Sequence, residues 1–366
     1  MRAFVVCLLL GMGLALSHVA AQAPQPAQAA PAQTPPAQGQ PAQTPPAQEA
    51  LKFDKTILRL DPALDKIISP DAELEIIKDN EFRGGEGPVW MPQGYLLFSA
   101  MVENRIYKYD PKSRDVSVFM EKSGLTYTTI EDFRAHGGAQ LVGTNGLAVD
   151  KQGRLIAGTH GDRNLWRLEK DGKKTILADH FGDKKLNGPN DLAIKSDGAI
   201  YFTDRGSGLE GAINSANPSP LREYPIGIMR LKDGKLDQLA KDDGVNGIAF
   251  SPDEKYLYGI SQFKKIINRY PVNKDGTLGE PEIAFIDMSK DTARGNPDGM
   301  KVDRNGNIFS TGPGGVWIVS PAGKLLGKIQ LPRNCPNLTF GDQDGKGLYM
   351  VGVSLYHIRL AAKATR

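Results

Sequence analysis

The sequence contains little cysteine and little histidine, with 2 and 5 residues among 366. Cys7 lies in an apolar segment near the N-terminus, so the rest of the chain carries Cys335 alone and cannot form an internal disulfide. We expect a buried thiol at this position rather than a reactive one, because free cysteine packs as a small apolar side chain. No group of histidines and cysteines has the spacing of a closed structural zinc site.

The chain also lacks an excess of one charge and any long hydrophobic run. Its 45 Lys and Arg residues nearly balance 42 Asp and Glu residues, and no basic block suggests a nucleic-acid partner. The apolar run from Ala3 to Leu16 is too short to span a membrane. Arg2 precedes it and Val19-Ala20-Ala21 follows, which is typical of a secretory signal peptide over residues 1–21. An uncleaved N-terminal anchor is the alternative.

The composition then changes twice along the chain. Residues 22–50 are mostly Pro, Ala and Gln, which predicts a disordered linker. Residues 51–366 have the length of one large all-β domain. We therefore expect an exported protein, in the periplasm or outside the cell, with no membrane span after signal cleavage. We expect it to be a monomer.

The folded region repeats one pattern six times. Each unit has a polar residue, a short apolar strand, a turn rich in Gly, Asn or Asp, and further strands. The units contain the segments EGPVW, NGLAVD, NDLAIK, NGIAFS, DGMKVD and NLTFGD. Repeats of a few tens of residues are typical of propellers and solenoids. Six four-stranded units predict an all-β fold, a six-bladed β-propeller.

Three further expectations concern the connections. A strand from about Ala72 to Ile77 completes the last blade, and the surrounding stretch from Asp61 to Asn80 holds one short helix or an edge strand. No convincing helical period occurs elsewhere in the folded region. The longest insertion, residues 206–225, is rich in Ser, Asn, Gly and Pro and is expected to lie over one face.

The most informative feature is the residue that opens each unit. Five units open with an oxygen-bearing side chain, and the sixth has Pro336 at this position, which leaves a gap. Asn-Gly and Asp-Gly pairs are also turn signals, but here they precede a strand that has its own turn at the far end. In a propeller these side chains meet in the central channel. The five residues are Glu86, Asn145, Asn190, Asn246 and Asp298.

Two carboxylates together with amide oxygens are suitable ligands for a hard divalent cation. The sequence therefore predicts a metal site in the central channel. Ca²⁺ suits this oxygen-rich set best, and Zn²⁺, Mg²⁺ and Mn²⁺ are alternatives.

Longer motifs resemble a known family. EGPVW, LNGPNDLAIKSDGAIYFTD, NGIAFSPDEKYLY and NPDGMKVDRNGNIFSTGPGGVWI resemble the gluconolactonase group of the senescence-marker-protein/gluconolactonase/LRE-like family, and the likeness extends from about Asp61 to Ile358. The resemblance implies one divalent metal in the channel of a six-bladed propeller. The ligands that it implies are Glu86, Asn190, Asn246 and Asp298. It also implies that Asp298 is the catalytic carboxylate.

Two other residues are candidates for contact with substrate. Asn145 lies in the same ring, and His160 ends the AGTH segment, although a lone histidine is more often structural. The family motif usually continues TDP, whereas Thr203-Asp204 is followed here by Arg205. We expect this arginine to be a solvated surface charge, with contact to an acidic product as the alternative.

The resemblance implies a metal-dependent hydrolase that opens a sugar lactone, a small-molecule substrate. The metal would polarise the ester carbonyl and Asp298 would activate water, or attack directly. The same site acting on other lactones or phosphotriesters is one alternative. A non-catalytic secreted propeller that binds a partner is the second. A quinone-dependent sugar dehydrogenase is disfavoured, because the five histidines offer no assignable cofactor contacts.

Overall fold

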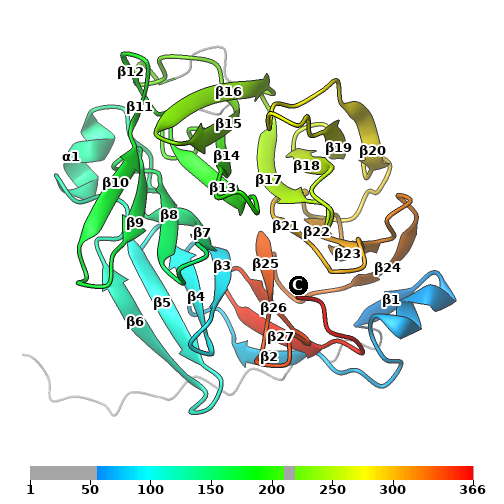
Figure 1. Ribbon diagram of the computed structural model, residues 1–366. Helices are drawn as coiled ribbons and strands as arrows, with labels where there is room; N and C mark the ends of the chain where they lie inside the picture. The colour runs from blue at the N-terminus through cyan, green and yellow to red at the C-terminus, as the bar shows by residue number, and fades with distance from the viewer. Residues whose placement is uncertain (1–55, 210–218, 366) are drawn as a thin grey trace, which may run out of the picture. The chain divides into compact units, whose positions relative to one another are not determined.

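The computed structural model describes residues 56–209 and 219–365. The predicted signal peptide and linker, residues 1–21 and 22–50, lie outside these ranges. Within them, strands alternate with tight turns and form six sheets around a common axis (Figure 1). The predicted six-bladed β-propeller is confirmed. No helix in the described ranges is both long and apolar enough to cross a membrane.

Each blade is an antiparallel sheet whose first strand lies nearest the axis. Blade 1 consists of β3 (Gly85–Met91), β4 (Tyr95–Ala100), β5 (Arg105–Asp110) and β6 (Asp115–Glu121). Blade 2 consists of β7 (Thr144–Val149), β8 (Leu155–Thr159), β9 (Leu165–Leu168) and β10 (Lys174–Ala178). Blade 3 consists of β13 (Pro189–Ile194), β14 (Ile200–Asp204), β15 (Gly227–Lys232) and β16 (Lys235–Lys241). A small hairpin, β11 (His180–Phe181) with β12 (Lys184–Lys185), separates blades 2 and 3 in the sequence.

Of the other three blades, the last two include strands from both ends of the described chain. Blade 4 consists of β17 (Val245–Phe250), β18 (Tyr256–Ser261), β19 (Ile266–Pro271) and β20 (Glu282–Asp287). Blade 5 consists of β21 (Met300–Val302), β22 (Ile308–Gly312), β23 (Gly315–Val319) and β24 (Leu325–Ile329), with β1 (Ile57–Arg59) added at its outer edge. Blade 6 consists of β25 (Asn337–Gly341), β26 (Gly347–Val351), β27 (Leu355–Arg359) and β2 (Glu75–Lys78).

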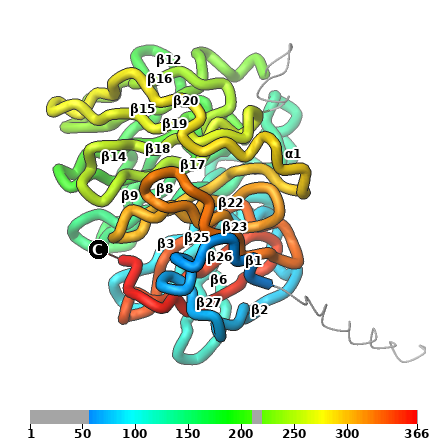
Figure 2. Tube along the Cα trace, turned by 90° about the vertical axis from the view of Figure 1, so that its right-hand side faces the viewer, coloured from blue at the N-terminus to red at the C-terminus, as the bar shows by residue number. Residues whose placement is uncertain are grey.

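The N-terminal strands close the ring, as the sequence predicted. The strand β2 pairs antiparallel with β27, so the first and last parts of the domain share one sheet. The extra strand β1 pairs with β24, which the sequence did not predict. Figure 2 shows these blue N-terminal strands beside the orange and red C-terminal ones. Between β1 and β2 lies the expected short helix, a 3-10 turn at Pro62–Lys66.

One helix was not predicted. The helix α1 (Ile130–Ala135) has six residues, too few to show a hydrophobic period. Its local signal is a cap, because the Thr129 hydroxyl accepts a hydrogen bond from the Asp132 backbone N–H at 3.0 Å. Phe133 anchors the helix in the interior and is 3% exposed.

The segment after α1 contacts the two described ends of the 206–225 loop. The Ala139 N–H donates to the Gly208 carbonyl at 2.8 Å, and the Ser219 hydroxyl donates to the Gly137 carbonyl at 3.0 Å. Residues 210–218 of that loop lie outside the described ranges.

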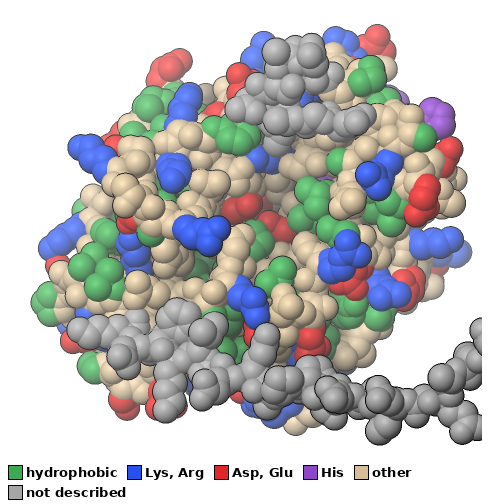
Figure 3. Space-filling model, turned by 180° about the vertical axis from the view of Figure 1, so that it is seen from behind, with side chains coloured by type: hydrophobic (Ala, Val, Ile, Leu, Met, Phe, Trp, Pro, Cys, Tyr) green, Lys and Arg blue, Asp and Glu red, His purple; other side chains and the backbone are tan. Residues whose placement is uncertain are grey.

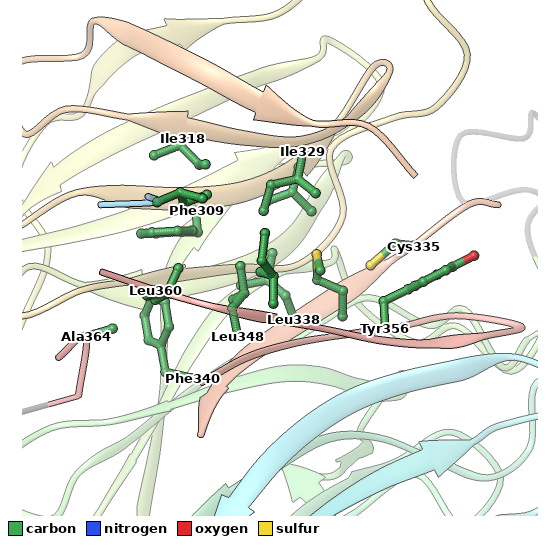
Figure 4. Close-up of a cluster of buried hydrophobic side chains, with 14 of the residues drawn as sticks. Phe309, Ile318, Ile329, Cys335, Leu338, Phe340, Leu348, Tyr356, Leu360 and Ala364 are labelled. Carbon is green, nitrogen blue, oxygen red and sulfur yellow. The ribbon is translucent and has the colours of Figure 1, made fainter. Parts of the chain in front are cut away.

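Apolar side chains fill the space between neighbouring blades. The largest cluster joins blades 5 and 6, where Phe309 meets Phe340 edge-on with ring centres 5.0 Å apart (Figure 4). Cys335 lies in this cluster and is 7% exposed. The expectation of a buried cysteine is confirmed, and burial raises the pKa of its thiol.

Candidate active site

The structure places the predicted ring residues at one end of the channel. Glu86, Asn145, Asn190 and Asn246 are each the second residue of an innermost strand, and Asp298 stands two residues before β21. The first four are each 3% exposed, and Asp298 is partly exposed. The innermost strands start around one axis, so the repeat pattern of the sequence becomes a ring in space (Figure 1).

The glycines that follow ring residues serve a different purpose from turns. A Cβ atom on Gly87 would lie 1.9 Å from the Asn145 carbonyl oxygen, and one on Gly247 would lie 2.4 Å from that of Asp298. The Gly247 N–H instead donates to the Asp298 carbonyl at 2.7 Å. These positions need glycine because the innermost strands of adjacent blades approach closely here.

Four of the ring side chains interact, two through a hydrogen bond and two through their charges. The Asn190 amide nitrogen donates to the Asn246 amide oxygen at 3.1 Å. Burial and the negative charge of Asp298 raise the pKa of Glu86 well above its ordinary value. Burial also raises the pKa of Asp298, to about 6, although the nearby positive charge of Arg205 lowers it. A buried carboxyl group whose pKa is raised by the negative charge of a second carboxylate is at a position that favours a nearby cation.

The sixth blade does not leave a gap, which corrects the expectation at Pro336. The next residue, Asn337, is 2% exposed and its amide nitrogen donates to the Glu86 carboxylate at 2.9 Å. The glycine at 299 makes room for this side chain, because a Cβ there would lie 2.2 Å from the Asn337 amide carbon. The comparison of the six repeat units did not identify Asn337, because this residue stands where most units have glycine.

A second missed residue occupies the same position in blade 3. Asp191 is 2% exposed, and its carboxylate accepts hydrogen bonds from the backbone N–H groups of Leu192 at 3.0 Å and Ile248 at 3.2 Å. Burial raises the pKa of this carboxyl group. The departure from glycine at this position, shared by Asp191 and Asn337, was the signal that could have identified both.

The two predicted substrate contacts are buried and short of hydrogen-bond partners. The Asn145 amide nitrogen contacts the Met101 sulfur at 3.2 Å, while its amide oxygen has no partner in the described ranges. His160 is fully buried, and neither ring nitrogen makes a well-formed hydrogen bond to a described residue. Burial lowers the pKa of His160 to about 4, helped by the positive charge of Arg205, so the ring is neutral at pH 7.

Arg205 is not a solvated surface charge, which corrects the second expectation. Its side chain is 5% exposed and donates to two backbone carbonyls, those of Gly244 at 3.2 Å and Val245 at 2.6 Å. It directly follows β14, and the equivalent positions after β4, β8 and β18 hold Met101, His160 and Gln262. These four positions form a second set of side chains around the channel mouth.

The donor set of the ring fits a divalent cation. Buried carboxylate and amide oxygens are the ligands that hard cations prefer, and an unpaired amide oxygen at Asn145 lies in the same ring. Acidic side chains gather in a depression near the centre of one face (Figure 3). Residues 56–209 and 219–365 contain no group of three or more His, Cys, Asp or Glu arranged to hold a metal, so a cation here would depend on the amides.

Comparison with known proteins gives a consistent result. Residues 84–354 match the SMP-30/Gluconolactonase/LRE-like region. The chain is 32% identical over 306 residues to a gluconolactonase of Zymomonas mobilis. The aligned region covers 80% of this chain and 83% of that protein. The structure of a gluconolactonase from Xanthomonas campestris has 31% identity and a TM-score of 0.68, covering 83% of this chain and 94% of that one.

A more distant structure shares only the fold. It is that of regucalcin, a calcium-binding protein from Agrobacterium tumefaciens, with 18% identity, a TM-score of 0.62, and coverage of 80% of this chain and 96% of that one. The family match spans most of the folded domain and includes every ring residue. The chain therefore belongs to the SMP-30/gluconolactonase/LRE-like family.

Proposed function

We propose that this protein is a lactonase that uses a divalent cation to open a sugar lactone. The observation that carries the proposal is the ring of two carboxylates and two amides at the channel mouth, three of them buried, in a chain whose relatives include gluconolactonases. Glu86, Asn190, Asn246 and Asp298 would hold the cation. When bound, it would polarise the ester carbonyl of the substrate.

The other steps belong to the side chains themselves. Asp298 accepts a proton from the attacking water, since this residue lies at the channel mouth and is partly exposed. Asn145 and the neutral His160 bind substrate hydroxyls, because a neutral imidazole offers one donor and one acceptor and both of its nitrogens lack well-formed bonds. A hydroxyl-rich lactone satisfies groups that are costly to leave unpaired.

The test is hydrolysis of glucono-1,5-lactone by the full chain, before and after treatment with a chelator. We expect chelation to abolish turnover and added Ca²⁺ to restore it. The Asp298→Ala variant should lose at least about 100-fold in kcat, the usual contribution of a positioned base. The control is Asp287→Ala, an exposed carboxylate at the end of β20 that should leave turnover unchanged. Full activity after metal removal, or in Asp298→Ala, would contradict the proposal.

A further inference from the structure

A hydrogen-bonded chain of side chains leads from Arg205 through Gln262 to Asp298. We propose that Arg205 and Gln262 are positioning residues: Arg205 fixes the side-chain amide of Gln262, and this amide holds the Asp298 carboxylate in its working orientation. The inference rests on the proposed lactonase function. It gives Arg205 a role that the sequence did not predict, and it adds Gln262, which neither the repeat pattern nor the family resemblance singled out.

The three residues come from three successive blades. Arg205 directly follows β14 in blade 3, Gln262 directly follows β18 in blade 4, and Asp298 precedes β21 in blade 5. These strands are neighbours around the axis (Figure 1). The chain of contacts therefore crosses two blade boundaries at the channel mouth, where the ring residues also lie.

All three guanidinium nitrogens of Arg205 donate hydrogen bonds. Its Nε donates to the Ser207 hydroxyl at 3.1 Å, one terminal nitrogen donates to the carbonyls of Gly244 and Val245, and the other donates to the Gln262 Oε1. The guanidinium also lies over the Phe263 ring, 5.4 Å from its centre. A buried cation with this many partners has little freedom to reorient.

The chemistry of arginine decides which way the Gln262 amide faces. A guanidinium has donors only, so the group that it meets must be the amide oxygen and not the NH₂ group. The NH₂ group then faces the other way, where its nitrogen lies 3.2 Å from the Asp298 Oδ2. A carboxylate accepts this hydrogen bond, whereas a flipped amide would present an oxygen to an oxygen. Arg205 thus determines that Asp298 receives a donor.

Asp298 is restrained through its carboxylate as well as its backbone, whose carbonyl accepts from the Gly247 N–H. Its backbone N–H donates to the Thr311 hydroxyl at 2.8 Å, and its carboxylate accepts from Gln262. Holding a reacting group within a fraction of an ångström of its working geometry is worth a large factor in rate, and a 1 Å displacement can cost about 100-fold. The positive charge of Arg205 also lies close enough to act on both Asp298 and Glu86.

The first test measures kcat and KM for glucono-1,5-lactone with Arg205→Met, Gln262→Met and the double variant. We expect each single change to lower kcat about 10- to 100-fold with KM changed less than about 3-fold. The double variant should be no worse than the poorer single variant, because both changes break one chain of contacts. Arg205→Lys, which keeps charge and a donor, should recover part of kcat.

Two control variants separate positioning from loss of stability. Arg230→Met removes a guanidinium that is 9% exposed and bonded to the Asp237 carboxylate and the Asp275 carbonyl, and Gln238→Met removes an amide bonded to the Pro225 carbonyl. Both should keep the wild-type kcat. The proposal is overturned by wild-type kcat in Arg205→Met or Gln262→Met, by losses that multiply in the double variant, or by equal losses in the controls.

A second measurement does not need turnover. In the metal-free protein, the NMR signals of the Gln262 side-chain NH₂ can be identified by their absence in Gln262→Met. Their exchange with water should be slow in the wild-type protein and at least about 10-fold faster in Arg205→Met, because the amide is then free to rotate. Equal exchange rates would overturn the inference even if the enzyme hydrolyses lactones. A wild-type protein without lactonase activity but with the expected exchange difference would refute only the proposed function.

Discussion

Buried polar side chains crowd the channel mouth, and several lack the partners that burial normally requires. Asn190 and Asn246 share one hydrogen bond, and the Glu86 carboxylate accepts another from Asn337, so part of the hydrogen-bonding capacity of these side chains is satisfied. The Asn145 oxygen and the His160 ring nitrogens have no well-formed hydrogen bond within residues 56–209 and 219–365. Leaving such groups unpaired costs about 1–3 kcal/mol each, so they indicate where a ligand would bind.

At this scale we predict the effect of His160→Gln. If the neutral ring binds a substrate hydroxyl, glutamine keeps a donor and an acceptor but holds them at different positions. One hydrogen bond worth about 1 kcal/mol is then lost, and KM should rise about 5-fold with a smaller change in kcat. His180→Gln, at an exposed position in β11, is the matched control and should leave both constants unchanged. Steady-state kinetics on glucono-1,5-lactone measures both. An unchanged KM in a folded His160→Gln protein would assign this histidine to the core.

At the scale of elements, the start of each innermost strand fixes the ring. The glycine after a ring residue donates its N–H to the corresponding carbonyl of the next blade, as Gly247 does to Asp298 and Gly299 does to Pro336. Blade-to-blade hydrogen bonds therefore set the spacing of the ring, in addition to apolar packing between the sheets. A small change in the distance between innermost strands should therefore move the ring side chains relative to one another.

We predict that Gly247→Ala disrupts this arrangement. The new methyl group would lie 2.4 Å from the Asp298 carbonyl oxygen, so the two blades must separate. Overpacking of this kind typically costs about 1–3 kcal/mol, and lactone turnover should fall with it because the Asp298 backbone moves. Thermal unfolding and kcat are the measurements. Gly279→Ala, where the nearest side-chain atom would be 3.5 Å from the Cβ, should change neither.

At the scale of the whole domain, the ring is closed by non-covalent contacts between the two ends of the chain. The strand β2 joins β27, and His357 of β27 lies between Glu75 and Asp342, at 3.3 and 3.2 Å. Burial opposes ionisation of Asp342, but hydrogen bonds from His357, Tyr349 and Arg359 outweigh it and lower the pKa to about 2. The carboxylate therefore stabilises the closed blade in its charged form.

The pH dependence of stability follows from this shift. A carboxyl group whose pKa falls from 3.8 unfolded to about 2 folded stabilises the folded state above about pH 4, by about 2 kcal/mol, and this contribution is lost as the pH falls through 2. Asp342→Asn should therefore cost about 2 kcal/mol at pH 6 and progressively less towards pH 2. Asparagine tolerates the positive φ of 63° at this position, so the change tests charge and not backbone strain.

Equilibrium unfolding in denaturant at several pH values measures this difference. The control is Asp171→Asn, an exposed carboxylate beside Lys173, which should cost little at any pH. A constant cost of Asp342→Asn from pH 6 to pH 3 would contradict the electrostatic explanation.

The sequence alone determined the architecture and most of the ring. Six repeats of strand and turn identify the blades because each strand carries its own apolar alternation and turn residues, which are local properties. The same repeats place Glu86, Asn145, Asn190, Asn246 and Asp298 at equivalent positions, which the propeller then brings together. The helix α1 and the extra strand β1 were missed, because six and three residues are too short to carry a period.

Only the tertiary structure showed what lies between the repeats. Asn337 and Asp191 take part in the ring because they occupy spaces that glycine leaves open elsewhere, and an alignment of units cannot show which neighbour a side chain reaches. The burial of Arg205 and its contact with Gln262 likewise depend on three blades meeting at one point. Such contacts join residues between 57 and 251 positions apart, so no local pattern specifies them, and packing around the axis alone decides them.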